Sequence, residues 1–176
     1  MGRIFTATGD DGNTYCNSLK ARVPKDHPII ELIGSLDEVN SFVGMARALV
    51  PSYLGEVQSD LKKLQYLIFR LGFHISGSKS LNEEDLKFLE ELADKYYGRE
   101  PLKNFVLPSG PLPSSSLHVA RTVARRAERS LVRASKNYSF DDIVFKVINR
   151  LSSVLFAMAV YISRKLGYED EPVSFR

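Results

Sequence analysis

Apolar residues recur at alternating three- and four-residue steps through most of the chain, which is the period of an amphipathic helix. Each such helix has one apolar stripe to bury, and strand signals are few, so the pattern favours helices that pack on one another. The sequence therefore predicts an all-α fold, a five-helix bundle. The expected helices cover about 29–50, 54–75, 82–97, 117–135 and 141–166.

Turn-forming residues mark the ends of these segments. Pro51 ends the first helix, the Gly-Ser-Lys-Ser run at 77–80 ends the second, and Asn82 is positioned to cap the third. Four prolines between residues 101 and 113 predict an extended connection over 99–113. Ser114-Ser115-Ser116 then predicts the N-cap of the arginine-rich fourth helix.

A chain of 176 residues is long enough for one well-cored domain and short for two. Its 44% hydrophobic and 26% charged residues are ordinary values for a globular protein. We therefore expect a single domain over 1–176, with an N-terminal arm at 1–27, the helical bundle at 28–168 and a tail at 169–176.

The balance of charge and the use of cysteine narrow the range of partners. With 24 basic and 21 acidic residues, the net charge of +3 does not indicate a nucleic-acid partner. Cys16 is the only cysteine, which excludes an intramolecular disulfide and fits a reducing cytosol. Charged Arg3, Asp10 and Asp11 interrupt any signal-peptide pattern, and the longest apolar run, 154–162, is too short for a membrane span. We expect a soluble, cytoplasmic protein.

The fourth expected helix carries four arginines between residues 117 and 129. Arg121, Arg125 and Glu128 fall together beside a narrow, alanine-rich apolar seam, at the edge of a helix contact, which is where a bundle builds a polar site. Guanidinium groups one turn apart suit a polyphosphate, because each offers a planar fork of donors with permanent charge. Structural ion pairs between helices are the alternative explanation.

A second candidate site is the segment 6–14 of the arm, where hydroxyls alternate with glycines that can turn backbone N–H groups towards one point. This arrangement is typical of a phosphate-binding nest, although an ordinary surface turn is the alternative. The acidic pair Asp10-Asp11 would repel phosphate unless magnesium or a basic residue such as Lys25 lay between. The residues concerned are Thr6, Thr8, Gly9, Asp10, Gly12, Asn13 and Thr14.

Two polar residues interrupt otherwise apolar helices. Asp37 lies between apolar positions of the first helix and is a candidate to pair with an arginine of another helix. A purely structural ion pair, without a role in a functional site, is the alternative. Asn149 shares a face of the last helix with Ser152 and Phe156, and a buried, hydrogen-bonded asparagine is the alternative there. The three histidines show no metal-ligand spacing, so no metal-ligating residues are predicted.

Taken in order, these motifs resemble the PduO-type ATP:cob(I)alamin adenosyltransferases. The resemblance rests on the arginine helix and on residues 6–14, 34–41, 105–108 and 149–152. It implies a five-helix bundle that assembles as a homotrimer, with active sites between neighbouring subunits. It also implies transfer of the 5′-deoxyadenosyl group of ATP to the cobalt of cob(I)alamin, with release of triphosphate.

The same resemblance assigns roles towards ATP. The arm residues 6–14 and Lys25 would wrap the phosphates, Arg125 and Glu128 would contact ATP from the arginine helix, and Asn149 would bind it from the last helix. Magnesium would accompany the nucleotide. No general base is needed, because cobalt(I) is nucleophilic enough to attack the ribose carbon unaided, and the protein orients ATP and neutralises its leaving group.

On the corrinoid side, the resemblance implies that Phe105 fills the lower face of cobalamin and displaces the axial ligand, which makes cobalt(II) easier to reduce. It implies that Asp37 and Arg121 pair across the subunit interface. A reductase or a cobalamin-dependent enzyme is a candidate further partner. The alternatives are a carrier or sensor bundle that binds nucleotide and cobalamin without catalysis, and a purely structural helical trimer.

Overall fold

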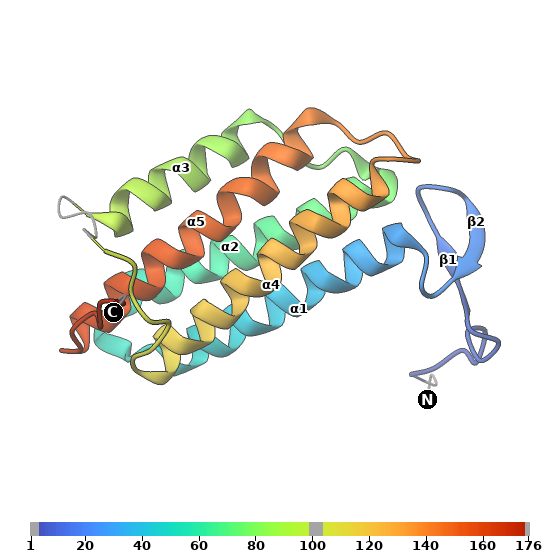
Figure 1. Cartoon of the computed structure of the whole chain (residues 1–176). Coiled ribbons are helices and arrows are strands. Elements are labelled where there is room, and N and C mark those ends of the chain that lie inside the picture. The colour runs from blue at the N-terminus through green and yellow to red at the C-terminus, as the bar shows by residue number, and fades with distance from the viewer. Residues whose placement is uncertain (1–3, 99–103, 175–176) are drawn as a thin grey trace.

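The computed structural model describes residues 4–98 and 104–174, in which five long helices lie side by side as a bundle (Figure 1). The all-α, five-helix prediction is confirmed. A short 3-10 turn, Ser52–Leu54, precedes the second helix and a π-helical turn, His74–Ser78, follows it. The helices are α1 (Pro28–Leu49), α2 (Gly55–Phe73), α3 (Glu83–Tyr97), α4 (Leu112–Ala134) and α5 (Asp142–Lys165).

The apolar seam of α4 lies at the centre of the bundle. Leu117, Ala120, Ala124, Ala127 and Leu131 are all 0% exposed, and α4 packs against both α1 and α5. Small alanine side chains let these neighbours approach closely, as in other tightly packed helix pairs. Because the seam is central, the residues that flank it, Arg121, Arg125 and Glu128, lie at the borders between α4 and its neighbours.

Helix α5 is long and apolar enough to resemble a membrane span by composition alone. In the structure it packs between α3 and α4, and Val147, Leu151 and Leu155 on it are fully buried in the core. A helix that is hydrophobic over most of its surface is expected at the centre of a bundle. We therefore assign α5 as the core helix of a soluble protein.

The predicted serine cap of α4 is wrong. The helix begins at Leu112, with Pro111 at the N-cap position, and it includes Pro113, which was expected in the extended connection, because a proline is tolerated in a first turn where its missing N–H is not needed. Ser114 consequently lies inside the helix, is 0% exposed, and donates from Oγ to the carbonyl oxygen of Ala159 on α5 at 2.9 Å. The serine joins two helices instead of capping one.

The cap predicted at Asn82 is confirmed. The Asn82 side chain accepts from the backbone N–H of Asp85 at 3.2 Å, and Asp85 accepts in return from the Asn82 N–H at 2.9 Å. Arg70 of α2 reaches the same carboxylate with two bonds of 2.7 Å. This cap therefore also fastens α3 to α2.

The arm contains a β-hairpin that the sequence analysis did not anticipate. Strands β1 (Asn13–Cys16) and β2 (Ala21–Pro24) pair antiparallel, with Thr14 opposite Val23 and Cys16 opposite Ala21. The strands are short and only Cys16 and Val23 turn towards the core, so the alternating pattern is too brief to recognise. Figure 1 shows the hairpin beyond the end of α1, with the preceding residues directed away from the helices.

Candidate functional site

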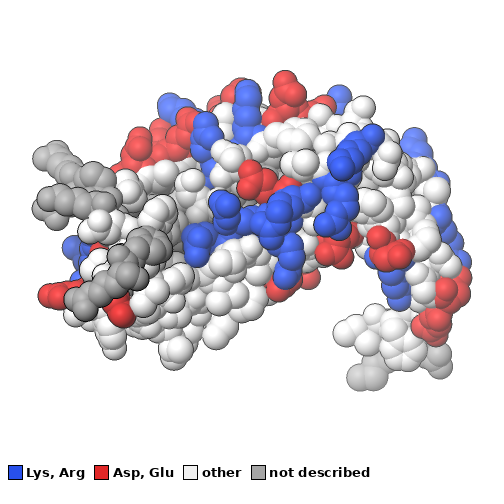
Figure 2. Space-filling view, viewed as in Figure 1, with Lys and Arg blue, Asp and Glu red and all other residues white. Residues whose placement is uncertain are grey.

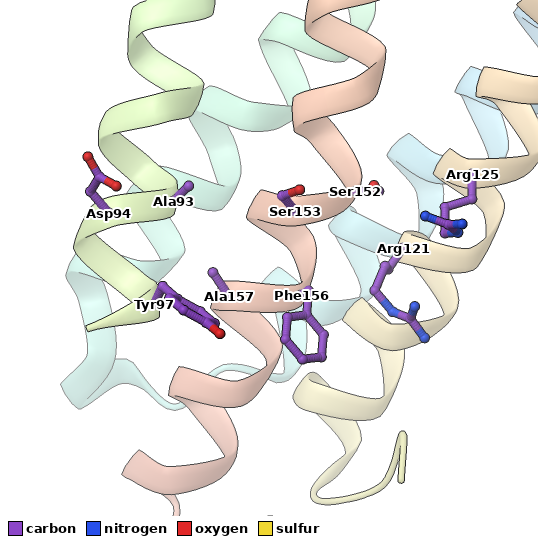
Figure 3. A pocket seen from close by; sticks show the side chains of 9 residues that line it. All are labelled: Ala93, Asp94, Tyr97, Arg121, Arg125, Ser152, Ser153, Phe156 and Ala157. Carbon is purple, nitrogen blue, oxygen red and sulfur yellow. The ribbon is translucent and has the colours of Figure 1, made fainter. Parts of the chain in front are cut away.

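The arginines of α4 border an open cavity of about 430 Å³ between α3, α4 and α5. Figure 3 shows Arg121 and Arg125 on one side of this cavity, Phe156 of α5 in the middle, and Tyr97 of α3 on the other side. The remaining lining side chains are Ala93, Asp94, Ser152, Ser153 and Ala157. An apolar surface with a few convergent charged groups is typical of a ligand site.

Arg121 is held against an aromatic ring at the border of the cavity. Its guanidinium carbon lies 6.0 Å from the centroid of Phe156, a cation–π geometry. Burial, and after it the charge of Arg125, lowers the pKa of Arg121, although an arginine remains protonated at neutral pH. Its Nε is buried and has no hydrogen-bond partner among the described residues. The guanidinium is thus charged and incompletely paired within one chain.

His118 lies one turn before Arg121 and is only 6% exposed. Its ring is 6.0 Å from that of Phe156, and its Nδ1 has no partner in the part of the chain that the structure describes. Burial, and after it the charge of Arg121, lowers the pKa of His118, so the imidazole is neutral at neutral pH. The sequence analysis assigned it no role, because a single histidine on a helix has no distinguishing pattern.

Glu128 and Asn149 meet where α4 and α5 cross. The Asn149 amide donates to Oε1 of Glu128 at 3.0 Å, and Arg150 donates to Oδ1 of Asn149 at 2.8 Å. Asn149 is exposed, so the alternative of a buried core asparagine is wrong. The structure therefore brings together two residues that the sequence analysis had placed on separate helices.

Ion pairing accounts for only part of the arginine cluster. Arg126 pairs with Glu38 of α1, as expected for an arginine on the outer face of the helix. Neither Arg121 nor Arg125 forms a salt bridge within residues 4–98 and 104–174. Figure 2 shows basic side chains gathered over α4 and α5. A structural ion pair therefore accounts for Arg126, but not for Arg121 and Arg125, whose positive charges lie beside the cavity.

Asp37 lines a different cavity, of about 400 Å³, between α1 and α2. Its neighbours there include Asn40, Phe69 and Phe73, and both phenylalanines are more than half exposed. Arg121 does not line this cavity, and Asp37 makes no salt bridge among the described residues. Within one chain, Asp37 and the arginine cluster therefore line two separate cavities.

Phe105 projects from the connection before α4 and is 80% exposed. Its backbone is held by the tail, since the carbonyl oxygen of Phe105 accepts from the N–H of Val173 at 2.7 Å. The N–H of Leu107 donates to the carbonyl oxygen of Glu171 at 2.9 Å. The tail thus positions the backbone of this aromatic residue while its side chain remains accessible.

In the arm, Arg22 organises the turn that the sequence analysis singled out. It donates to the carbonyl oxygen of Thr8 at 2.6 Å and to Asp11 at 2.9 Å. The backbone N–H of Asn13 bonds the same carboxylate at 3.0 Å, and hydrogen bonding by Asn13, followed by the charge of Arg22, lowers the pKa of Asp11. Thr6 and Thr8 share a hydroxyl bond of 2.9 Å. Arg22 went unnoticed because only the hairpin brings it back to the turn.

Lys25 closes the same turn. Its N–H donates to the carbonyl oxygen of Gly12 at 2.9 Å, and Gly12 has a φ of +79°, which favours glycine. A Cβ on Gly9 would lie 3.2 Å from the Lys25 Nζ, so the ammonium lies directly beside this glycine. Asp10 is exposed and Thr14 belongs to β1. Figure 1 shows the arm beyond one end of the bundle, away from the cavity between α3, α4 and α5.

Two further lining residues, Tyr97 and Asp94, come from α3, to which the sequence analysis assigned no function. They lie near the end of the helix, off its buried stripe, and are exposed in this chain. An exposed tyrosine next to a terminal glycine carries no recognisable signal by itself. Only the packing of α3 on α5 places it opposite the arginines.

A groove between helices, lined by aromatic rings and by two arginines without a salt bridge among the described residues, is typical of ligand-binding helical bundles. Within this class, residues 4–162 match the family model described as cobalamin adenosyltransferase, and the chain belongs to that family.

Proteins of known name match nearly the full length of this chain. The corrinoid adenosyltransferase of Bacillus subtilis (strain 168) is 35% identical, with 99% of this chain and 96% of the relative covered. The human corrinoid adenosyltransferase MMAB is 36% identical over 96% of this chain and 72% of its own length. Among solved structures, a variant PduO-type ATP:corrinoid adenosyltransferase from Lactobacillus reuteri complexed with cobalamin and ATP superposes with a TM-score of 0.88. It is 32% identical and is matched over 97% of this chain and 96% of its own.

Proposed function

We propose that this chain transfers the 5′-deoxyadenosyl group of ATP to the cobalt of cob(I)alamin and releases triphosphate. The observation that carries the proposal is the pair Arg121 and Arg125, two charged groups without an ion-pair partner in the described chain, beside an aromatic cavity. In the transfer, the cobalt(I) electron pair forms a bond to C5′ of the ribose. The bond between C5′ and the triphosphate oxygen breaks, and the oxygen keeps its electron pair.

The residues around the cavity fit the demands of this displacement. Arg125 would neutralise the charge that develops on triphosphate, and the joined Glu128 and Asn149 would hold the remainder of ATP in line with cobalt. Phe105, whose side chain is exposed, would cover the lower face of the corrin and keep a donor ligand away from cobalt. A cobalt centre without that ligand is easier to reduce to the nucleophilic state.

We infer that the active site is completed by a neighbouring subunit of a homotrimer. Two separations support this inference: Asp37 and Arg121 lie in different cavities of one chain, and the arm lies away from the arginine cavity. A neighbour would supply Asp37 to Arg121 and the segment 6–14, with Lys25, to the phosphates. The buried, unpartnered Nε of Arg121 is consistent with a missing acceptor.

Magnesium would come with the nucleotide. Among the described residues no group of three or more His, Cys, Asp or Glu side chains could hold a metal ion. A magnesium ion that keeps its waters and binds mainly to phosphate oxygens needs only one protein carboxylate, and Asp10 is the exposed candidate. The ion would add positive charge beside the leaving group, and the protein would supply the rest from Lys25 and the arginines. We place this reaction in the cytoplasm, with a reductase or a cobalamin-dependent enzyme as a candidate partner.

The deciding experiment mixes the protein anaerobically with chemically reduced cob(I)alamin and magnesium-ATP. The absorbance change to adenosylcobalamin and the release of triphosphate are followed together. Formation of both products in equal amounts is expected. Release of phosphate without adenosylcobalamin, or no product from a protein that binds both substrates, would contradict a transferase.

The competing carrier or sensor function uses the same binding residues and is favoured if both ligands bind without turnover. A purely structural trimer predicts that ATP binds nowhere. Magnesium-ATP at about 100 times its Kd should stabilise a binding protein by about 2.7 kcal/mol and raise its melting temperature. An unchanged melting temperature at such concentrations would favour the structural trimer.

A further inference from the structure

The arm joins the bundle at His27, where one imidazole makes two bonds. Its Nδ1 accepts from the N–H of Ile29 at 3.3 Å and so caps α1, while Nε2 lies 2.8 Å from the hydroxyl of Tyr138. Because Nδ1 is an acceptor, Nε2 carries the proton and donates to Tyr138. The two rings are also in contact, with centroids 5.2 Å apart. Tyr138, in the turn between α4 and α5, therefore holds the last residue of the arm.

The remaining contacts of the hairpin leave room for movement. Cys16 and Val23 are buried, but Ser18 and Leu19 line a cavity of about 290 Å³ against the end of the bundle. Tyr138 lines the same cavity. A cavity at this junction means that apolar packing alone does not set the angle of the hairpin, because its lining atoms lack partners on one side.

A second contact keeps the turn that carries Tyr138 in place. His74 is buried, accepts from the N–H of Leu81 at 3.0 Å through Nδ1, and donates from Nε2 to Asp141 at 2.9 Å. Asp141 is the N-cap position of α5, three residues after Tyr138. The turn is thus fixed to the end of α2, and Tyr138 offers the arm a rigid point of attachment.

The segment 6–14 is tied directly to this junction. Asn13 pairs with Pro24 at the open end of the hairpin, and the N–H of Lys25, two residues before His27, donates to the carbonyl oxygen of Gly12 at 2.9 Å. A displacement of His27 is therefore passed to the segment 6–14 through these contacts. A misplacement of about 1 Å is enough to cost up to about a hundredfold in rate when a group must meet a reacting substrate.

We propose that Tyr138 is a positioning residue for ATP: through its bond to His27 it sets the angle at which the arm presents segment 6–14 to the nucleotide phosphates. The inference rests on the proposed function, in which the arm contacts ATP. Tyr138 itself touches neither substrate, because it acts through His27.

The test is Tyr138→Phe, which removes only the hydroxyl. Loss of one hydrogen bond at the junction should raise the KM for magnesium-ATP by about five- to tenfold. The KM for cob(I)alamin, the kcat at saturating ATP and the melting temperature should stay close to those of the wild type. Tyr53→Phe is the matched control, because Tyr53 is 71% exposed in the turn before α2 and should behave as wild type.

His27→Asn separates capping from positioning. Asparagine is a good N-cap but lacks the imidazole that reaches Tyr138, so this variant should show the same rise in KM for ATP. The double variant should be no worse than either single one, because both remove the same bond. Trypsin should also cleave faster after exposed Lys20 in both variants, which reports the loosened arm independently of catalysis.

The outcomes separate the two proposals. If wild type and Tyr53→Phe form no adenosylcobalamin, the proposed function fails. If they are active and Tyr138→Phe matches them in its KM for ATP, the positioning role is refuted. Equal rises in both KM values, or a lowered melting temperature with unchanged KM, would instead assign Tyr138 a general structural role and overturn the inference.

Discussion

Glu128 on α4 accepts a hydrogen bond from the side-chain amide of Asn149 on α5, with 3.0 Å between Oε1 and Nδ2. The contact joins the arginine helix to α5 one turn from Arg125, at the same border between helices as the cavity. Glu128 forms no salt bridge with Arg125 in the part of the chain that the structure describes. The positive charge of Arg125 therefore stays available to an anionic ligand.

Arg125→Ala should remove turnover without unfolding the bundle. Arg125 is exposed and makes no salt bridge in the described part of the chain, so the free energy of unfolding should change by no more than about 0.5 kcal/mol. Loss of one group that stabilises the leaving triphosphate should lower kcat/KM by about 10²- to 10³-fold. Adenosylcobalamin formation and far-ultraviolet circular dichroism measure the two effects.

Arg133→Ala is the matched control, because Arg133 is an exposed arginine in the last turn of the same helix. It should keep the activity of the wild type. An Arg125→Ala protein that turns over normally would exclude this arginine as a contact to ATP.

Exchanging charges should test the pairing of Asp37 with Arg121 between subunits. Asp37→Arg and Arg121→Asp should each weaken association by at least about tenfold, because each leaves a charge in the interface without its partner. The double variant should recover the sedimentation coefficient of the wild type. Glu31→Arg, an exposed acid on the same helix as Asp37, should assemble normally. Normal assembly of Asp37→Arg would argue against the pair.

His118 should make stability depend on pH. Burial and the charge of Arg121 lower the pKa of this imidazole below its ordinary value of 6.5 in the folded state. Below that pH the unfolded chain takes up a proton that the folded chain refuses, so the free energy of unfolding falls as pH decreases. His118→Leu should lose less stability than wild type between about pH 7 and pH 5 in chemical denaturation. Parallel pH profiles for the two proteins would contradict a depressed pKa.

Asp60→Asn should reduce stability and spare catalysis. The buried Asp60 carboxylate accepts from Tyr96 at 2.8 Å and from Lys95 at 2.6 Å, which ties α2 to α3 through residues that do not line the cavity. Although burial alone would raise the pKa of Asp60, these bonds lower it. Loss of its charge should cost about 2 kcal/mol of unfolding free energy.

Glu91→Gln provides the comparison for Asp60→Asn. Glu91 forms an exposed pair with Lys87 at 3.7 Å and should change stability by less than about 1 kcal/mol. Both variants should retain the kcat of the wild type. A large loss of kcat in Asp60→Asn at a temperature where it is folded would connect this cluster to the active site.

The positions and faces of the helices could be predicted from the sequence, because helical periodicity and capping are local properties of the chain. The alanine seam of α4 and the cap at Asn82 follow from residue spacing alone. The β-hairpin and the start of α4 could not be predicted. The strands are too short to show alternation, and Ser114 resembles a cap until its partner on α5 is known.

By itself the sequence determined the five-helix bundle and placed Arg121, Arg125 and Glu128 on one edge of a helix. Tertiary structure alone decided that Asn149 meets Glu128, 21 residues away, and that Tyr138 meets His27, 111 residues away. It also decided that Asp37 lines a separate cavity from the arginines. Such relations depend on how helices cross and how loops return, which are set by packing of the whole core and leave no pattern in neighbouring residues.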